Sequence, residues 1–237
     1  MNGFIVDWHS LNYPINLESI FNRNSETELE VGFGNGVFLL QIAKDNPSKN
    51  FIGIELVNFF AKKADKKIKN AGIDNVRLFV GDAKLLLLIL FQDKVFDHIY
   101  FNFPDPWFKK KHKKRRLLKF GFNCLLAKRL KDGGLISVAT DHPEFRDFVL
   151  ESVLDSGFFA SVYPSGFTTE NPGYYPTKYE QKWRSQGKEI YYMKFKKIFH
   201  PVVFDVNEYL TEENLWYVVY SKGLNRVIKD LRKTCRG

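Results

Sequence analysis

The sequence predicts an α/β fold with a doubly wound, mostly parallel seven-stranded sheet that ends in an antiparallel edge hairpin. From about Thr27, short strand-like runs alternate with segments of helix length, the pattern of successive right-handed βαβ units. The strand-like runs are almost continuously apolar, as expected when helices cover both faces of a sheet. After Thr140 the alternation stops, and two further strand-like runs predict the hairpin.

The alternating part contains nine candidate elements. Strands are predicted at 27–34 (TELEVGFG), 50–56 (NFIGIEL), 75–82 (NVRLFVGD), 96–103 (FDHIYFNF) and 134–140 (GLISVAT). Helices are predicted between them at 37–46, 58–70, 83–91 and roughly 114–131.

The remainder predicts a helix at 143–156, a strand in FFASVYP, a loop rich in Gly, Pro, Thr and Asn at 165–176, and a strand in EIYYMKFKK. We therefore expect an N-terminal segment at 1–26, one catalytic-type domain at 27–198 and a C-terminal extension at 199–237 packed on that domain.

Composition narrows the function classes. Hydrophobic residues make up 44% of the 237 residues, which excludes a chain disordered through low hydrophobicity. Cys124 and Cys235 stand far apart, so neither a disulfide framework nor a metal site is expected. The N-terminus lacks an export signal and the longest apolar run, 85–91, is too short for a bilayer, so we expect a cytoplasmic protein without a membrane partner.

The charge is strongly positive. Against 27 Asp and Glu stand 36 Lys and Arg, giving a formal charge of +9, which favours a polyanionic partner. Much of the excess lies in one block, KKKHKKRR at 109–116. This block favours nucleic acid, although a solvated basic loop or a localisation signal has the same composition.

A glycine-rich turn follows the first strand. Gly32, Gly34 and Gly36 have GxGxG spacing, with Val37 where a dinucleotide fingerprint needs its third glycine. Such a turn brings backbone amides close to a ligand. The spacing favours a cofactor without a pyrophosphate, and a turn that only links strand to helix is the alternative.

Three acids accompany the turn. Glu30 lies just before it, Glu55 ends the second strand and Asp82 ends the third, all at the carboxyl edge where open α/β sheets bind ligands. Glu55 is placed to accept hydrogen bonds from ribose hydroxyls, or else is an ordinary charge at a strand end. Asp82 is suited to an adenine amino group, and Glu30 to a cationic amino-acid portion.

The fourth strand ends in FNFPDPW. Pro104 and Pro106 restrict the backbone around Asp105, which predicts a preorganised carboxylate. Asn102 and Asp105 resemble the loops with which some methyltransferases hold exocyclic amines. A base held near Asp105 would place its phosphates near the basic block, namely Lys109, Lys110, Lys111, Lys113, Lys114, Arg115 and Arg116.

These motifs together resemble the bacterial tRNA (guanine-N7)-methyltransferases. The resemblance covers about 29–197 and rests on LEVGFGNGVFLL, IGIEL, GDA, FPDPWFKKKHKKRR, ATDH and TKYEQKWRSQGKEIYYMKFKK. It implies the class I methyltransferase fold and S-adenosylmethionine (SAM) as cofactor, bound by Glu30, Glu55, Asp82 and Asp105. We add the neighbouring Gly32, Gly34, Gly36 and Ala83 to this cofactor set.

The resemblance also implies a substrate set of Lys109, Asp141, Thr177 and Glu180. Residue by residue, simpler roles remain open: Asp141 can cap the helix at 143–156, and Thr177 with Glu180 has the spacing of a capping box. Among the aromatic residues only Trp107 is expected to stack on a base, with core packing the alternative.

The chain departs from the family pattern in two places. Phe108 stands where the family has Pro, and His112 is the basic run's only histidine. The shorter members known to us have no counterpart for about 40 residues after Lys197.

The resemblance implies methyl transfer to N7 of a guanine in the tRNA variable loop. Asp105 is the candidate catalytic carboxylate, and Asp141 is the alternative for stabilising the positive charge that develops on the ring. We expect a monomer or homodimer. N7 has a lone pair and no proton, so positioning, without a general base, suffices. The rivals are a methyltransferase with another acceptor and a catalytically silent RNA-binding subunit.

Overall fold

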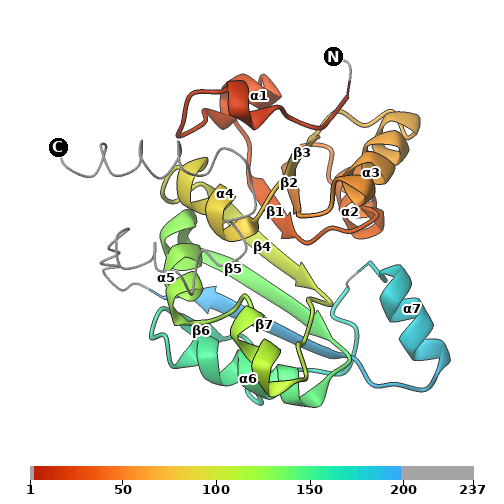
Figure 1. Ribbon diagram of the computed structural model, residues 1–237, viewed down its shortest axis with the longest axis vertical. Coiled ribbons are helices and arrows are strands. Elements are labelled where there is room, and N and C mark those ends of the chain that lie inside the picture. Colours follow the sequence, from red (N-terminus) through yellow and green to blue (C-terminus); the bar gives the residue numbers. More distant parts are fainter. Residues whose placement is uncertain (1–2, 174, 199–237) are drawn as a thin grey trace.

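The computed structural model describes residues 3–173 and 175–198, and its centre is a seven-stranded sheet in the order β3-β2-β1-β4-β5-β7-β6 (Figure 1). The strands are β1 (Thr27–Val31), β2 (Asn50–Glu55), β3 (Val76–Val80), β4 (Phe96–Asn102), β5 (Leu130–Thr140), β6 (Phe159–Ser161) and β7 (Tyr191–Lys197). Strands β1 to β5 pair in parallel, whereas β7 pairs antiparallel with both β5 and β6. The predicted fold class and edge pairing are confirmed.

Helices cover both faces of the sheet. The α-helices are α1 (Leu17–Phe21), α2 (Val37–Asp45), α3 (Asn58–Asn70), α4 (Ala83–Ile89), α5 (Phe120–Arg129), α6 (Pro143–Leu154) and α7 (Lys178–Ser185), and the 3-10 helices are η1 (Trp8–Ser10) and η2 (Lys110–Arg115). Helices α2 and α3 pack on one face, and α4, α5 and α6 lie on the other (Figure 1). No helix in the described ranges is long and apolar enough to cross a membrane.

The larger core lies beneath α4, α5 and α6. It contains α4 almost entire, because Leu85, Leu86 and Leu87 are all buried between the sheet and its neighbours. The N-terminal segment also joins this core, since Trp8 is buried and its indole nitrogen donates to the Val80 carbonyl oxygen at 3.0 Å. The segment before β1 is therefore part of the described fold.

The predicted helix at 114–131 begins later than expected. The structure has η2 over the basic block, then an extended stretch, and α5 starts only at Phe120. Successive cations three and four residues apart repel one another along a helix face, which disfavours a continuous helix there. At the other end β5 begins directly after α5, at Leu130.

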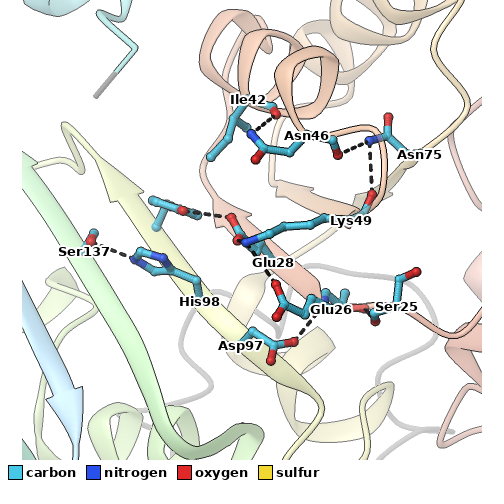
Figure 2. A network of polar contacts seen from close by, with 12 residues as sticks. Ser25, Glu26, Glu28, Ile42, Asn46, Lys49, Asn75, Asp97, His98 and Ser137 are labelled. Carbon is cyan, nitrogen blue, oxygen red and sulfur yellow. Dashed lines mark hydrogen bonds and ion pairs between the residues drawn. The ribbon is translucent and has the colours of Figure 1, made fainter. Parts of the chain in front are cut away.

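A buried polar network crosses β1 and β4 on the face covered by α2. The Glu28 carboxylate accepts hydrogen bonds from Tyr100 and from Lys49, both at 2.8 Å (Figure 2). His98 stacks on Tyr100 and lies 2.8 Å from the Ser137 hydroxyl. Burial lowers the pKa of His98 to about 3, so its ring is neutral and serves the packing of β4.

Candidate active site

The glycine turn is fixed to both neighbouring elements. Gly36 is left-handed, with a φ of 71°, and a Cβ there would lie 2.7 Å from the Ala64 Cβ of α3. Only glycine therefore allows α2 to begin so close to α3. The backbone N–H of Gly34 donates to Glu55 at 2.8 Å, which joins the turn to the end of β2.

Glu30 and Asn102 meet at the switch point of the sheet. Their strands, β1 and β4, are neighbours in the sheet although β2 and β3 lie between them in the sequence, so the strand order reverses here. Ligands bind at such points in open α/β sheets. The Asn102 amide donates to Glu30 Oε1 at 2.9 Å. Glu30 Oε2 and Asn102 Oδ1 are buried and have no hydrogen-bond partner among the described residues. Two unpaired acceptors side by side are suited to a donor group of a ligand.

The environment of Glu30 disfavours its charge. The pKa of Glu30 is raised to about 8, chiefly by burial; the hydrogen bond from Asn102 lowers it, and the negative charge of Glu55 adds to the rise. A cation bound beside the carboxylate would reverse this effect. The site is therefore electrostatically matched to a positively charged ligand group.

Glu55 and Asp82 both anchor backbone amides. Glu55 accepts from Gly34 through one oxygen and from the Val57 N–H through the other, at 2.9 Å. Asp82 caps α4, because its Oδ1 accepts from the N–H groups of Lys84 and Leu85 at 2.8 and 3.4 Å. Burial raises the pKa of Asp82 against these bonds. The structure thus brings the predicted acids to one edge, and Ala83 follows as the first residue of α4.

The loop after β4 has an unusual backbone. Phe103 and Trp107, which flank the Pro-Asp-Pro sequence, have positive φ values of 51° and 47°. Bulky residues seldom adopt this conformation, which costs roughly 1–3 kcal/mol each and persists only where the surroundings impose it. Asp105 lies between them and is exposed to solvent. The loop therefore presents the predicted catalytic carboxylate on a constrained backbone.

The basic block has two structural parts. Lys109, Lys111, Lys113 and Lys114 are exposed along η2. The Arg115 guanidinium lies 4.8 Å from the Trp107 ring centroid, and Arg116 is buried beneath the loop. The predicted RNA contacts stay predictions, and the exposed lysines are accessible to a phosphate backbone.

Three of the predicted substrate residues lie at or beside α7, which stands beyond the carboxyl ends of β4 and β5 (Figure 1), whereas Lys109 precedes η2. Thr177 caps α7, its hydroxyl accepting from the Glu180 N–H at 3.0 Å. The buried Glu180 carboxylate accepts from the Tyr192 hydroxyl and, at 2.9 Å, from Arg184. The N-cap position of α6 is occupied by His142, so Asp141 does not cap this helix. Asp141 instead forms an ion pair with Lys188 at 3.0 Å.

Lys188 and Tyr179 are neighbours of the site that the sequence reading did not single out. Lys188 pairs with Asp141 and also lies 3.5 Å from the Trp183 ring centroid. The ring of Tyr179 stacks on Phe103 with the centroids 6.5 Å apart. An exposed tyrosine in a polar helix and a lysine in the loop that follows it carry no distinguishing pattern, so only the tertiary structure reveals them.

Comparison with known proteins places the chain in one family. The profile of a family described as "Putative methyltransferase" matches residues 24–193. The tRNA (guanine-N(7)-)-methyltransferase of Aquifex aeolicus is 41% identical over 76% of this chain and 62% of its own length. Those of Thermotoga maritima and Nitrosococcus oceani are 36% and 35% identical over 78% of this chain, and over 58% and 77% of their own lengths. The chain thus spans about six tenths of the first two relatives.

Solved structures agree on the fold. The antibiotic-resistance methyltransferase Kmr has a TM-score of 0.55 at 16% identity, covering 80% of this chain and 95% of its own. The [4+2]-cyclase SpnF has a TM-score of 0.53 at 15% identity, covering 78% and 81%. With the sequence relatives, these likenesses identify the chain as a member of the tRNA (guanine-N(7)-)-methyltransferase family with the class I methyltransferase fold.

Proposed function

We propose that the protein transfers a methyl group from SAM to N7 of a guanine in the variable loop of tRNA. The observation that carries the proposal is the pair of unpaired buried acceptors at the switch point, Glu30 Oε2 and Asn102 Oδ1, beside the loop that presents Asp105. Family membership names the reaction that this arrangement would serve. We further propose that the enzyme works in the cytoplasm as a monomer or homodimer.

The residues present fit SAM. Glu30 and Asn102 offer hydrogen-bond acceptors to the cationic amino group of its methionine portion. This cation would lower the raised pKa of Glu30 and so stabilise its carboxylate form. Glu55 lies at the end of β2, where an acid accepts from ribose hydroxyls. Asp82 would accept a hydrogen bond from the adenine amino group, next to Ala83, the first residue of α4. The glycine turn allows the ligand to approach the backbone between these acids.

Catalysis requires positioning more than proton transfer. SAM supplies an electrophilic methyl group on a sulfonium, and guanine N7 carries a lone pair and no proton. Asp105 would hold the guanine by accepting from its N–H groups and would stabilise the positive charge that develops on the ring. The constrained backbone at Phe103 and Trp107 limits the movement of that carboxylate. No residue is assigned the role of general base.

The tRNA would be held on two sides of Asp105. The exposed lysines of the basic block are suited to phosphates, which they would bind without reading sequence. Asp141, Thr177 and Glu180 lie on the α7 side, and an approaching base would compete with Lys188 for Asp141. Trp107 is the aromatic residue best placed to stack on the base.

The experiment compares two transcripts of the same tRNA. One carries ordinary guanosine and the other 7-deazaguanosine, which replaces the nucleophilic N7 with a C–H. With methyl-labelled SAM, label should enter the first transcript and not the second. Equal labelling of both would exclude N7 as the acceptor but keep the methyltransferase. Failure to label either RNA, with SAM bound, would favour another acceptor, and failure to bind SAM would favour the silent RNA-binding subunit.

A further inference from the structure

We infer that Arg116 is a positioning residue, which fixes the loop bearing Asp105 from the α6 side and does not contact RNA. The inference deepens the proposed function and rests on it for the identity of the reaction. It divides the basic block: Lys109, Lys111, Lys113 and Lys114 are exposed, whereas the block's final arginine lies under the loop. The block would then bind RNA with one end and hold the catalytic loop with the other.

Within the described part of the chain, the side chain of Arg116 contacts the loop and α6. Its Nε donates to the Pro106 carbonyl oxygen at 2.8 Å. Its guanidinium carbon lies 4.7 Å from the ring centroid of Phe148 and 5.5 Å from that of Phe145, both on α6. The residue is only 3% exposed. A phosphate in solvent cannot reach a guanidinium covered in this way without displacing the loop.

The charge state of Arg116 makes its burial informative. Burial lowers the pKa of Arg116 and nearby Glu144 opposes that, but an arginine remains protonated at neutral pH. Its Nη2 has no partner among the described residues, which makes the buried cation costly. The hydrogen bond to Pro106 and the stacking on Phe148 offset this cost. A lysine can donate one hydrogen bond from Nζ, but it lacks the planar guanidinium whose Nε holds Pro106 while its face lies on Phe148, so it cannot keep both contacts in this geometry.

The loop needs such a support at this position. Pro106 lies directly between Asp105 and the left-handed Trp107. The hydrogen bond from Arg116 to the Pro106 carbonyl oxygen therefore fixes the Pro106–Trp107 peptide, one residue beyond Asp105. At the other end of the loop the Phe103 N–H donates to the Ala139 carbonyl oxygen at 2.9 Å. The loop is thus tied to β5 at its start and to Arg116 at its end, and the second tie is the one a single substitution removes.

The test uses Arg116→Lys, with Lys113→Gln from the exposed part of the block for comparison. At saturating tRNA and SAM we expect Arg116→Lys to lower kcat at least tenfold, with the tRNA Kd and its salt dependence changed less than twofold. Lys113→Gln should instead weaken the tRNA Kd and reduce the salt slope. An unchanged kcat in Arg116→Lys, or a smaller salt slope, would overturn the inference.

A second variant and a second readout keep the test independent of folding and of the reaction. Phe148→Leu keeps an apolar side chain but removes the stacking surface, and should also lower kcat without changing the salt slope. Amide exchange in the peptide covering 103–109 should be at least tenfold faster in Arg116→Lys, and unaltered exchange there would count against the inference. If the unsubstituted protein does not methylate N7, the proposed function fails while amide exchange still decides the role of Arg116.

Discussion

Glu30 has its chemistry strongly altered by burial at the proposed cofactor site. The residue is 2% exposed and its carboxyl group has a pKa raised to about 8, so without a bound cation it is mostly protonated at neutral pH. A cationic ligand favours the ionised form, and the proton must leave as the ligand binds. Affinity should therefore be weakest at low pH, rise as the pH approaches 8 and level off above it.

The first prediction follows from this sign. The Kd for SAM should fall by up to about tenfold per pH unit between pH 6 and 8, with release of about one proton. Calorimetry in buffers of different ionisation enthalpy measures both quantities. In Glu30→Gln, binding should be weaker and lose the pH dependence that Glu30 contributes. A Kd for the unsubstituted protein that stays constant across this range would show that Glu30 does not contact the cation.

At the scale of elements, α7 depends on its N-terminal cap. The Thr177 hydroxyl accepts a hydrogen bond from the Glu180 N–H at 3.0 Å. The side chain of Glu180 points into the protein, where it accepts hydrogen bonds from Tyr192 and Arg184. A short polar helix gains little stability from its own sequence, so its cap is a substantial part of what holds it in place.

Thr177→Ala should lower the free energy of unfolding by about 1 kcal/mol, with the effect largest on amide exchange within α7. Urea denaturation and exchange measurements give the two quantities. Thr177→Ser keeps the accepting oxygen and should stay close to the unsubstituted protein. Equal destabilisation by Ala and Ser would mean that the methyl group, and not the cap, is responsible.

How far the sequence predicts the structure also depends on the element. The strands were predictable because parallel, doubly covered strands are continuous apolar runs, and the acids at their ends follow from that placement. The helix predicted at 114–131 begins too early because the sequence pattern contains no measure of the repulsion between cations within the basic block. The burial of Arg116 depends on Phe148, 32 residues away on α6, and the pairing of Glu180 depends on Tyr192 of β7. Such long-range contacts leave no mark in local spacing.

At the scale of the whole molecule, the formal charge of +9 should make tRNA binding strongly dependent on salt. Replacing Lys111, Lys113 and Lys114 together by Gln should reduce the slope of log Kd against log salt by about 2–3, one phosphate contact for each lysine. Binding titrations at several salt concentrations give the slope. Replacing three exposed lysines of α3, namely Lys62, Lys63 and Lys66, tests whether the effect is local. Equal losses from both sets would mean that general charge, and not the basic block, binds the RNA.

The extension at 199–237 lies outside the described residues, so its expected packing on the domain stays a prediction. The fold from β1 to β7 nevertheless contains the whole proposed site. Glu30, Glu55, Asp82 and Asp105 all lie at the carboxyl edge of strands β1 to β4 or directly after it. The central claim therefore concerns what this edge does to RNA.

The most direct test is to locate the methylated nucleotide. Unmodified tRNA is incubated with SAM and the protein, and the product is cleaved by chemistry specific for N7-methylguanosine. We predict cleavage at one guanine of the variable loop, reduced at least about 100-fold when Asp105→Ala replaces the unsubstituted protein. Methylation at another atom or another position of the tRNA, or a yield unaffected by Asp105→Ala, would contradict the account.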